Sequence, residues 1–98
     1  MFARVVTVHV NPETVAESTR IYEESIVAAM KEQPGFQGTT LLTKVDGSGT
    51  AVSISIWATE ADMQAGEASG YLQAQFAKVG AFLTAPPASE YYEVSVQA

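Results

Sequence analysis

Three side chains stand out as candidates for chemistry in this sequence: Trp57, His9 and Tyr22. The only tryptophan, Trp57, offers a flat apolar wall and one N–H donor to an aromatic ligand. The only histidine, His9, could act as a general base, because an imidazole can take up and release a proton near neutral pH. Tyr22 could aim a hydroxyl at the same space. Residue type alone favours structural roles: a core tryptophan, a half-exposed strand-end histidine and a core tyrosine.

Most other reactive groups are missing from the sequence. It contains no cysteine, which excludes disulfides, thiolate nucleophiles and cysteine-ligated metals. One histidine cannot build a multi-histidine metal centre, and the acidic residues are expected on solvated helix faces. There is no phosphate-binding loop, no dinucleotide fingerprint and no Gly-x-Ser-x-Gly motif. We therefore expect no metal site.

Charge and length narrow the class of protein further. The formal net charge is −6, and the five basic residues are scattered. Nucleic-acid binding requires clustered cations, so we exclude it, and binding to an anionic membrane surface is disfavoured for the same reason. No apolar run approaches the roughly 18 residues of a membrane span, and the N-terminal segment lacks the pattern of a signal peptide. We expect one domain, residues 1–98, in the cytoplasm.

The hydrophobic pattern predicts the elements that position these residues. Alternation of apolar residues predicts strands, and apolar residues spaced three and four apart predict helices. Asn11-Pro12-Glu13 reads as a helix start, Asp46 to Gly49 as a hairpin turn, and Thr59 to Asp62 as a capping box. The expected strands are residues 2–10, 36–45, 50–58 and 90–97, and the expected helices are residues 12–31, a short one after Thr59, and 71–84.

This order, β-α-β-β-α-β, predicts an α+β fold of the ferredoxin-like type with a four-stranded antiparallel sheet. The two predicted central strands carry no charged residue except Arg4, although a sheet face in water should be rich in charge. Both faces therefore look covered, one by the helices and one by something outside the chain. The simplest cover is a second copy, so we predict a homodimer through the sheet.

The chain resembles the antibiotic biosynthesis monooxygenase-like (ABM) family of dimeric α+β barrels. The resemblance is carried by residues 33–38 (QPGFQG), the Asp46-Gly47 turn and residues 53–63 (SISIWATEADM). It implies a dimeric barrel with a pocket between helices and sheet in each subunit. The expected pocket residues are Thr7, His9, Ser53, Ser55 and Trp57, beneath Tyr22 and Phe76, with Tyr71 as a weaker candidate. Val6, Val8, Val10, Ile54 and Ile56 would face the partner.

The resemblance leaves several functions open. Haem-degrading members pair the tryptophan with a strand-one asparagine and a downstream histidine, where this chain has Glu67. Quinone-forming members carry an asparagine and a tyrosine at the positions of Ser53 and Met63. Our leading hypothesis is a cofactor-independent monooxygenase acting on a small electron-rich aromatic such as a polyphenol or quinol, without metal or flavin. His9 would be the base, Trp57 a stacking wall and Tyr22 a positioning hydroxyl. The alternatives are a non-catalytic ligand-binding dimer and a haem-binding or haem-degrading protein.

Overall fold

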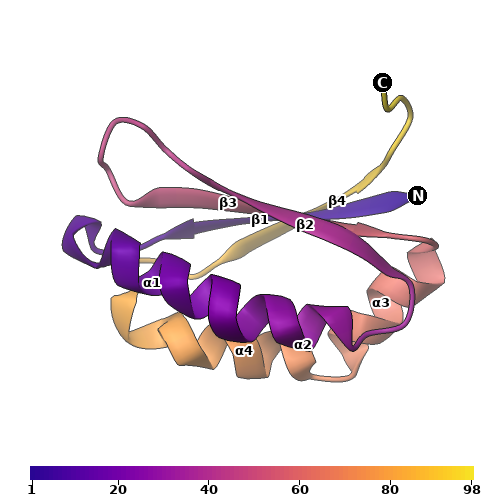
Figure 1. The fold of residues 1–98 in the computed structure, drawn as a ribbon, viewed down its shortest axis with the longest axis horizontal. Coiled ribbons are helices and arrows are strands. Elements are labelled where there is room, and N and C mark those ends of the chain that lie inside the picture. Colours follow the sequence, from indigo (N-terminus) through magenta and orange to yellow (C-terminus); the bar gives the residue numbers. More distant parts are fainter.

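The computed structural model describes residues 1–98, apart from the side chain of Leu72. Its centre is an antiparallel sheet in the order β2-β3-β1-β4. The strands are β1 (Phe2–His9), β2 (Phe36–Thr43), β3 (Thr50–Trp57) and β4 (Ala88–Glu93). Helices follow β1 and β3 and lie together on one face of the sheet (Figure 1). The predicted α+β, ferredoxin-like order of elements is confirmed.

The first helical segment begins at the predicted cap, where the Asn11 side chain accepts a hydrogen bond from the Glu13 amide. It runs through a short 3-10 turn (Pro12–Thr14), α1 (Val15–Ile21), a π-helical stretch (Tyr22–Ile26) and α2 (Val27–Lys31). π-Helical insertions in α-helices are rare and frequently occur at functional sites. This one begins at Tyr22, a candidate site residue.

Two glycines shape the second helical segment, α3 (Glu60–Ala68) and α4 (Tyr71–Val79), which ends in a 3-10 turn (Gly80–Phe82). Thr59 caps α3 by accepting a hydrogen bond from the Asp62 amide, as the capping pattern predicted. Gly70 separates the helices with a φ of 82°, a conformation that favours glycine. Gly66 lets α3 approach the core, because a Cβ there would lie 3.5 Å from the Trp57 ring and 3.1 Å from the Tyr71 ring.

The last strand is shorter and earlier than the predicted 90–97. β4 pairs with β1 from Ala88 opposite Thr7 to Glu93 opposite Phe2. A final backbone hydrogen bond joins the Val94 amide to the Met1 carbonyl. Beyond Val94 the chain has passed the end of β1, so no neighbouring backbone can continue the ladder, although the apolar alternation continues in the sequence.

The register between β1 and β3 corrects the predicted faces. Val6 lies opposite Ser53, and Thr7 lies opposite Val52. Because a shift of one residue moves a side chain to the other face, Val6, Val8 and Val10 share the helix-covered face with Ser53 and Ser55. Thr7 and His9 share the opposite face with Ile54 and Ile56. The prediction had paired these two sets the other way round.

That opposite face is uncovered in the single chain, because all the helices lie on the other side (Figure 1). Apart from His9 and the acidic Glu90 it is uncharged and mostly apolar: the central strands contribute Val5, Thr7, Val52, Ile54 and Ile56, and the outer strands contribute Thr40, Leu42 and Tyr92. Leu42 and Tyr92 are each 50% exposed. We call these eight residues the bare sheet face.

Candidate functional site

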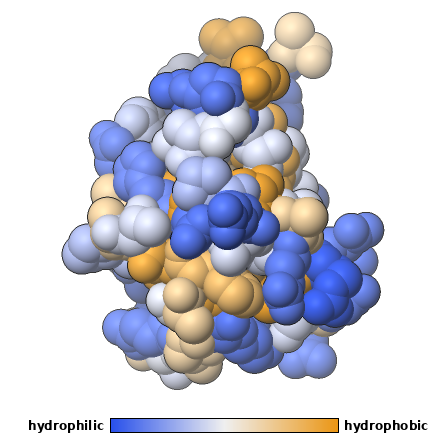
Figure 2. All heavy atoms as spheres, turned by 90° about the vertical axis from the view of Figure 1, so that its left-hand side faces the viewer, coloured by the Kyte–Doolittle hydropathy of each residue, from blue (hydrophilic) through white to orange (hydrophobic). Residues whose placement is uncertain are grey.

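A cavity of about 230 Å³ lies between the sheet and the helices. Its walls are largely aliphatic and aromatic, drawn from β1, β3, both helical segments and the β2–β3 hairpin. The residues that line it include Val6, Val8, Ser53, Ser55, Tyr22, Phe76, Gln75 and Arg4. Lys44, Gly47 and Pro12 also line it, which places one end beside the hairpin and the start of the first helical segment. Figure 2 views this end, where hydrophobic side chains show between hydrophilic ones.

A chain of three hydroxyls lies on the sheet side of the cavity. The Tyr22 hydroxyl lies 2.6 Å from Thr39 Oγ1 and 2.7 Å from Ser53 Oγ. Thr39 in turn donates to the Ile54 carbonyl at 3.2 Å. The helix residue Tyr22 is thereby fixed against two adjacent strands. Tyr22 and Ser53 line the cavity, and Thr39 anchors them from behind.

Gln75 on α4 brings an unusual group to the cavity wall. Its side chain is only 8% exposed, and its Oε1 has no hydrogen-bond partner among the described residues. Most buried polar atoms in native proteins are paired, so an unpaired one is informative. A buried acceptor without a partner costs about 1–3 kcal/mol, which a ligand donor would recover.

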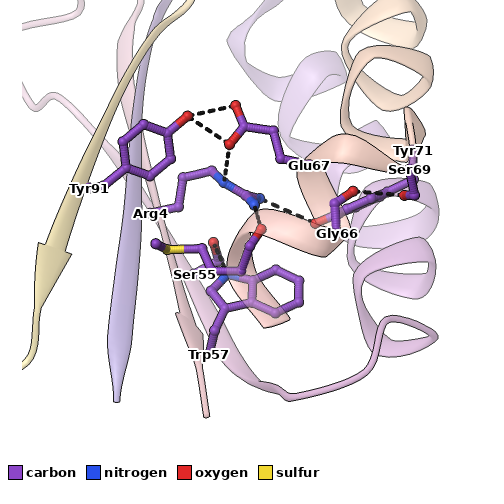
Figure 3. Close-up of polar contacts among 9 residues, drawn as sticks. Arg4, Ser55, Trp57, Gly66, Glu67, Ser69, Tyr71 and Tyr91 are labelled. Carbon is purple, nitrogen blue, oxygen red and sulfur yellow. Dashed lines mark hydrogen bonds and ion pairs between the residues drawn. The ribbon is translucent and has the colours of Figure 1, made fainter. Parts of the chain in front are cut away.

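Arg4 is buried at one side of the cavity, with 1% of its surface exposed. Its Nη2 donates to the Met63 carbonyl at 2.6 Å, and its Nη1 donates to the Tyr71 hydroxyl at 3.3 Å. Its Nε lies 3.9 Å from Glu67 Oε2 and makes no hydrogen bond. The guanidinium carbon lies 5.3 Å from the centre of the Trp57 ring, within cation–π range. Figure 3 shows Arg4 between Glu67 and Trp57.

Two tyrosines complete this cluster. The Tyr91 hydroxyl on β4 donates to the Glu67 carboxylate, 2.6 and 2.7 Å from its two oxygens, so Glu67 joins α3 to the sheet edge (Figure 3). That hydrogen bond raises the pKa of Tyr91 above its ordinary value. Burial raises the pKa of Tyr71, while the hydrogen bond from Arg4 acts in the opposite direction. Both groups therefore remain neutral phenols at ordinary pH.

Trp57 supports the cluster from beneath and does not line the cavity. Its side chain is fully buried, at 0% exposure, and packs edge-on against Phe36 with ring centres 5.6 Å apart. Its indole N–H donates to Ser55 Oγ at 3.0 Å. The tryptophan therefore contacts the cavity only through Ser55 and Arg4, both of which line it.

The structure sorts the predicted site residues into three groups. Tyr22, Ser53, Ser55 and Phe76 line the cavity together. Trp57 and Tyr71 lie behind its wall, in contact with Arg4. His9 and Thr7 lie on the other side of the sheet, where His9 is exposed and its Nδ1 lies 3.1 Å from Thr50 Oγ1.

Sequence reasoning missed Arg4, Gln75 and Glu67. A signal for Arg4 was present, because it shares the alternation of Val6 and Val8 and is the only charged residue in that strand. A charge on an apolar strand face indicates burial with partners. Gln75 follows Tyr71 by one helical turn, so it faces the same side of α4, but nothing in its residue type indicates an unpaired amide.

Two further features bear on the class of site. Within the described part of the chain, no group of three or more histidine, cysteine or acidic side chains lies close enough to hold a metal ion. Also within that part, no helix is both long and apolar enough to cross a membrane.

Comparison with known families identifies the fold's relatives. The family model described as antibiotic biosynthesis monooxygenase matches residues 1–78. This chain belongs to the antibiotic biosynthesis monooxygenase family. The match spans β1 to β3 and most of both helical segments, and so includes every residue that lines the cavity up to Phe76. No curated protein sequence matches the chain.

Several solved structures share the fold of this family member at low sequence identity. A monooxygenase from the gene ActVA-Orf6 of Streptomyces coelicolor, in complex with the ligand nanaomycin D, superposes with a TM-score of 0.80 at 20% identity, over 99% of this chain and 89% of its own. SnoaB, a cofactor-independent oxygenase from Streptomyces nogalater, superposes with a TM-score of 0.73 at 23% identity, over 98% of this chain and 92% of its own. A Nitrosomonas europaea protein of unknown function, NE2512, superposes with a TM-score of 0.80 at 22% identity, over 99% of this chain and 91% of its own.

Proposed function

We propose that this protein is a cofactor-independent monooxygenase that oxidises a small electron-rich aromatic compound in the cavity between sheet and helices. The observation that carries the proposal is the cavity itself: apolar walls, a few fixed hydroxyls from Tyr22, Ser53 and Ser55, and the buried cation Arg4 at its side. Such walls with few convergent polar groups are typical of sites for small aromatic ligands. Two proteins of the same fold are described as a monooxygenase and a cofactor-independent oxygenase.

The volume limits the size of the substrate. An engineered protein cavity of about 150 Å³ binds benzene, and pockets for drug-sized ligands begin at about 300 Å³. A cavity of about 230 Å³ therefore suits a compound of two fused rings.

In the proposed reaction the substrate supplies the electrons. The phenol loses its hydroxyl proton, and the charge of the resulting anion, which the Arg4 guanidinium beside the cavity favours, is delocalised onto a C–H carbon of the ring. The anion passes one electron to O₂, and the substrate radical and superoxide combine to form a hydroperoxide at the ring carbon. Loss of water then leaves a carbonyl, so one oxygen atom enters the product and the other leaves as water. The apolar walls limit the access of bulk water to the radical pair.

The proposed role of His9 as the base finds no support in the geometry, because His9 lies across the sheet from the cavity. Among the described residues that line the cavity, the ionisable side chains are Arg4, Lys44 and Tyr22. We propose that the proton leaves to water at the hairpin end, where Lys44 lies. Lys44 is 60% exposed and paired with Asp46 at 3.5 Å.

The lack of a carboxylate or imidazole base among the described lining residues favours a second candidate function, that of a binding protein without turnover. A cavity without a carboxylate or imidazole among its described lining residues can hold an aromatic ligand without activating it. The two functions differ in oxygen consumption, and one assay distinguishes them.

The assay is oxygen uptake with a panel of two-ring polyphenols, such as the dihydroxynaphthalenes. We expect uptake above the buffer rate and a product carrying one atom of labelled O₂. Val8→Phe fills the cavity and should abolish the uptake, while Val45→Phe makes the same change on the exposed hairpin and should not. Ligand binding without uptake would contradict the monooxygenase and support the binding protein.

We also propose that the bare sheet face packs against a second copy of the chain. The face is apolar across both central strands, and a face in permanent contact with water would carry more charge. Ile54→Glu should convert the dimer to a monomer in light scattering, and Ala16→Glu, on an exposed helical surface, should not. A monomeric unmodified protein at micromolar concentration would contradict the proposal.

A further inference from the structure

We propose that Ser53 and Ser55 present opposite hydrogen-bonding polarity to the cavity, Ser53 as an acceptor and Ser55 as a donor. The ligand they select carries a hydroxyl toward Ser53 and a carbonyl toward Ser55, which is the pattern of a hydroxylated aromatic ketone or quinone. This inference rests on the proposed function only in taking the cavity as the ligand site. It does not depend on oxygenation.

The polarity of Ser53 follows from the hydroxyl chain behind it. A backbone carbonyl can only accept, so the single Thr39 hydrogen is committed to the Ile54 carbonyl. The close contact between Thr39 and Tyr22 must then use the Tyr22 hydrogen. Tyr22 has no second hydrogen, so its contact with Ser53 uses the hydrogen of Ser53. Ser53 Oγ, which is 9% exposed, is left with only lone pairs for a ligand.

The polarity of Ser55 follows from Trp57. An indole N–H is a donor only, so Ser55 Oγ accepts in the contact of 3.0 Å between them. No described residue accepts the Ser55 hydrogen. Ser55 is 2% exposed and lines the cavity, so that hydrogen has no partner in bulk water and is available to a ligand acceptor.

The two serines are fixed relative to each other by the strand. They are two residues apart on β3 and lie on one face, which separates them by roughly 7 Å. That distance spans an aromatic ring system, so one ligand can contact both. Neither group is charged, so the pair selects a neutral hydroxyl and a neutral carbonyl.

The test measures binding without oxygen, by calorimetry, with three probes of similar size. 1-Naphthol donates a hydrogen bond, 1-methoxynaphthalene only accepts, and 1,4-naphthoquinone only accepts, at two positions. We expect 1-naphthol to bind about fivefold more tightly than 1-methoxynaphthalene, the effect of one hydrogen bond. Ser55→Ala should weaken the binding of 1,4-naphthoquinone by about the same factor. It should leave the preference for 1-naphthol over 1-methoxynaphthalene unchanged.

Tyr22→Phe tests the donor–acceptor order of the three hydroxyls. If Tyr22 had only a structural role, its loss would not change the relative affinities of the two naphthalene probes. Without the Tyr22 oxygen, the Ser53 hydrogen is released toward the cavity. Affinity for 1-methoxynaphthalene should therefore rise, and the naphthol preference should fall toward one. Ser69→Ala is the matched control, since Ser69 also donates to a backbone carbonyl, that of Gly66, but does not line the cavity, and it should change neither ratio.

The outcomes separate this inference from the proposed function. Equal binding of naphthol and methoxynaphthalene, or a Tyr22→Phe variant with an unchanged preference, would overturn the assigned polarity and leave the cavity as the ligand site. No binding of any probe would overturn both. Binding with the expected pattern but without oxygen uptake in the separate assay would leave the inference standing and contradict the monooxygenase alone.

Discussion

The indole N–H of Trp57 donates to the hydroxyl oxygen of Ser55, two residues earlier on the same strand, at 3.0 Å. Trp57 itself is fully buried and does not reach the cavity, whereas Ser55 does. The tryptophan that sequence analysis placed as a stacking wall is therefore a positioning residue. It orients one hydroxyl and supports the buried Arg4 with its ring face.

Trp57→Phe should separate these two roles of the tryptophan. Phenylalanine keeps an aromatic ring in contact with Arg4 and Phe36 but removes the donor to Ser55. The Ser55 hydroxyl is then free to rotate, so the affinity for 1,4-naphthoquinone should fall severalfold, measured by anaerobic calorimetry.

Trp57→Ala, by contrast, should cost about 3–5 kcal/mol in the free energy of unfolding, as expected for a large buried aromatic. Activity lost in that variant would reflect unfolding and cannot assign a catalytic role. A Trp57→Phe variant that binds 1,4-naphthoquinone as tightly as the unmodified protein would contradict the positioning role.

Arg4 should be among the residues most sensitive to substitution. Arg4→Met removes the charge that faces Glu67 and leaves the Met63 carbonyl without its donor. We expect a loss of about 3 kcal/mol, measured by urea unfolding, because breaking a buried charge pair leaves the partner uncompensated.

Arg20 provides the matched control for Arg4. It pairs with Glu17 and Glu24 on the helix surface and is 58% exposed. Exposed pairs contribute about 0–1 kcal/mol, so Arg20→Met should change stability little. Equal losses in the two variants would contradict the buried role of Arg4.

Stability should decline at alkaline pH through Tyr71 and Tyr91. Both pKa values are raised in the folded protein above the ordinary 10.0, so folding stabilises the neutral phenols. Their contribution is fully present below about pH 10 and is lost as pH rises through the raised values. Urea unfolding from about pH 8 to about pH 11 should show the decline, and Tyr71→Phe should make it shallower. If the unmodified protein and Tyr71→Phe lost stability identically with pH, the decline could not be attributed to the raised pKa of Tyr71.

Gln75→Met should raise stability and weaken ligand binding together. Methionine has a similar volume and no unpaired acceptor, so the ligand-free protein should gain about 1 kcal/mol. The bound state loses an acceptor, so the affinity for a ligand with a second hydroxyl, such as 1,5-dihydroxynaphthalene, should fall. Thermal unfolding with and without 1,5-dihydroxynaphthalene measures both effects. A variant that is both less stable and unchanged in affinity would show that Gln75 Oε1 has no role in binding.

The sequence predicted the order of elements because each carries its own local signal. Asn11 and Thr59 cap their helices as expected, and the Asp46–Gly49 turn joins β2 to β3. Local signals failed where pairing between distant strands decides the outcome. The end of β4 is set by where β1 begins, and the apolar alternation of residues 94–96 says nothing about that.

The site was predicted in part for the same reason. Ser53, Ser55, Tyr22 and Phe76 lie together as predicted, because the two serines are on the helix-covered face of β3 and Tyr22 and Phe76 are on the helices that cover it. His9 and Thr7 were misplaced because both faces of β1 are rich in β-branched residues, so alternation alone cannot tell which one faces Ser53. Only the register with β3 decides that, and Val6 opposite Ser53 puts His9 on the other face.

A crystal structure of the protein soaked with 1-naphthol would show directly where the ligand binds. We expect the ring between the sheet and the helices, among Val6, Val8 and Phe76, with its hydroxyl donating to Ser53 Oγ. A ring bound on the bare sheet face or the outer surface, with the cavity closed by its own side chains, would contradict this expectation.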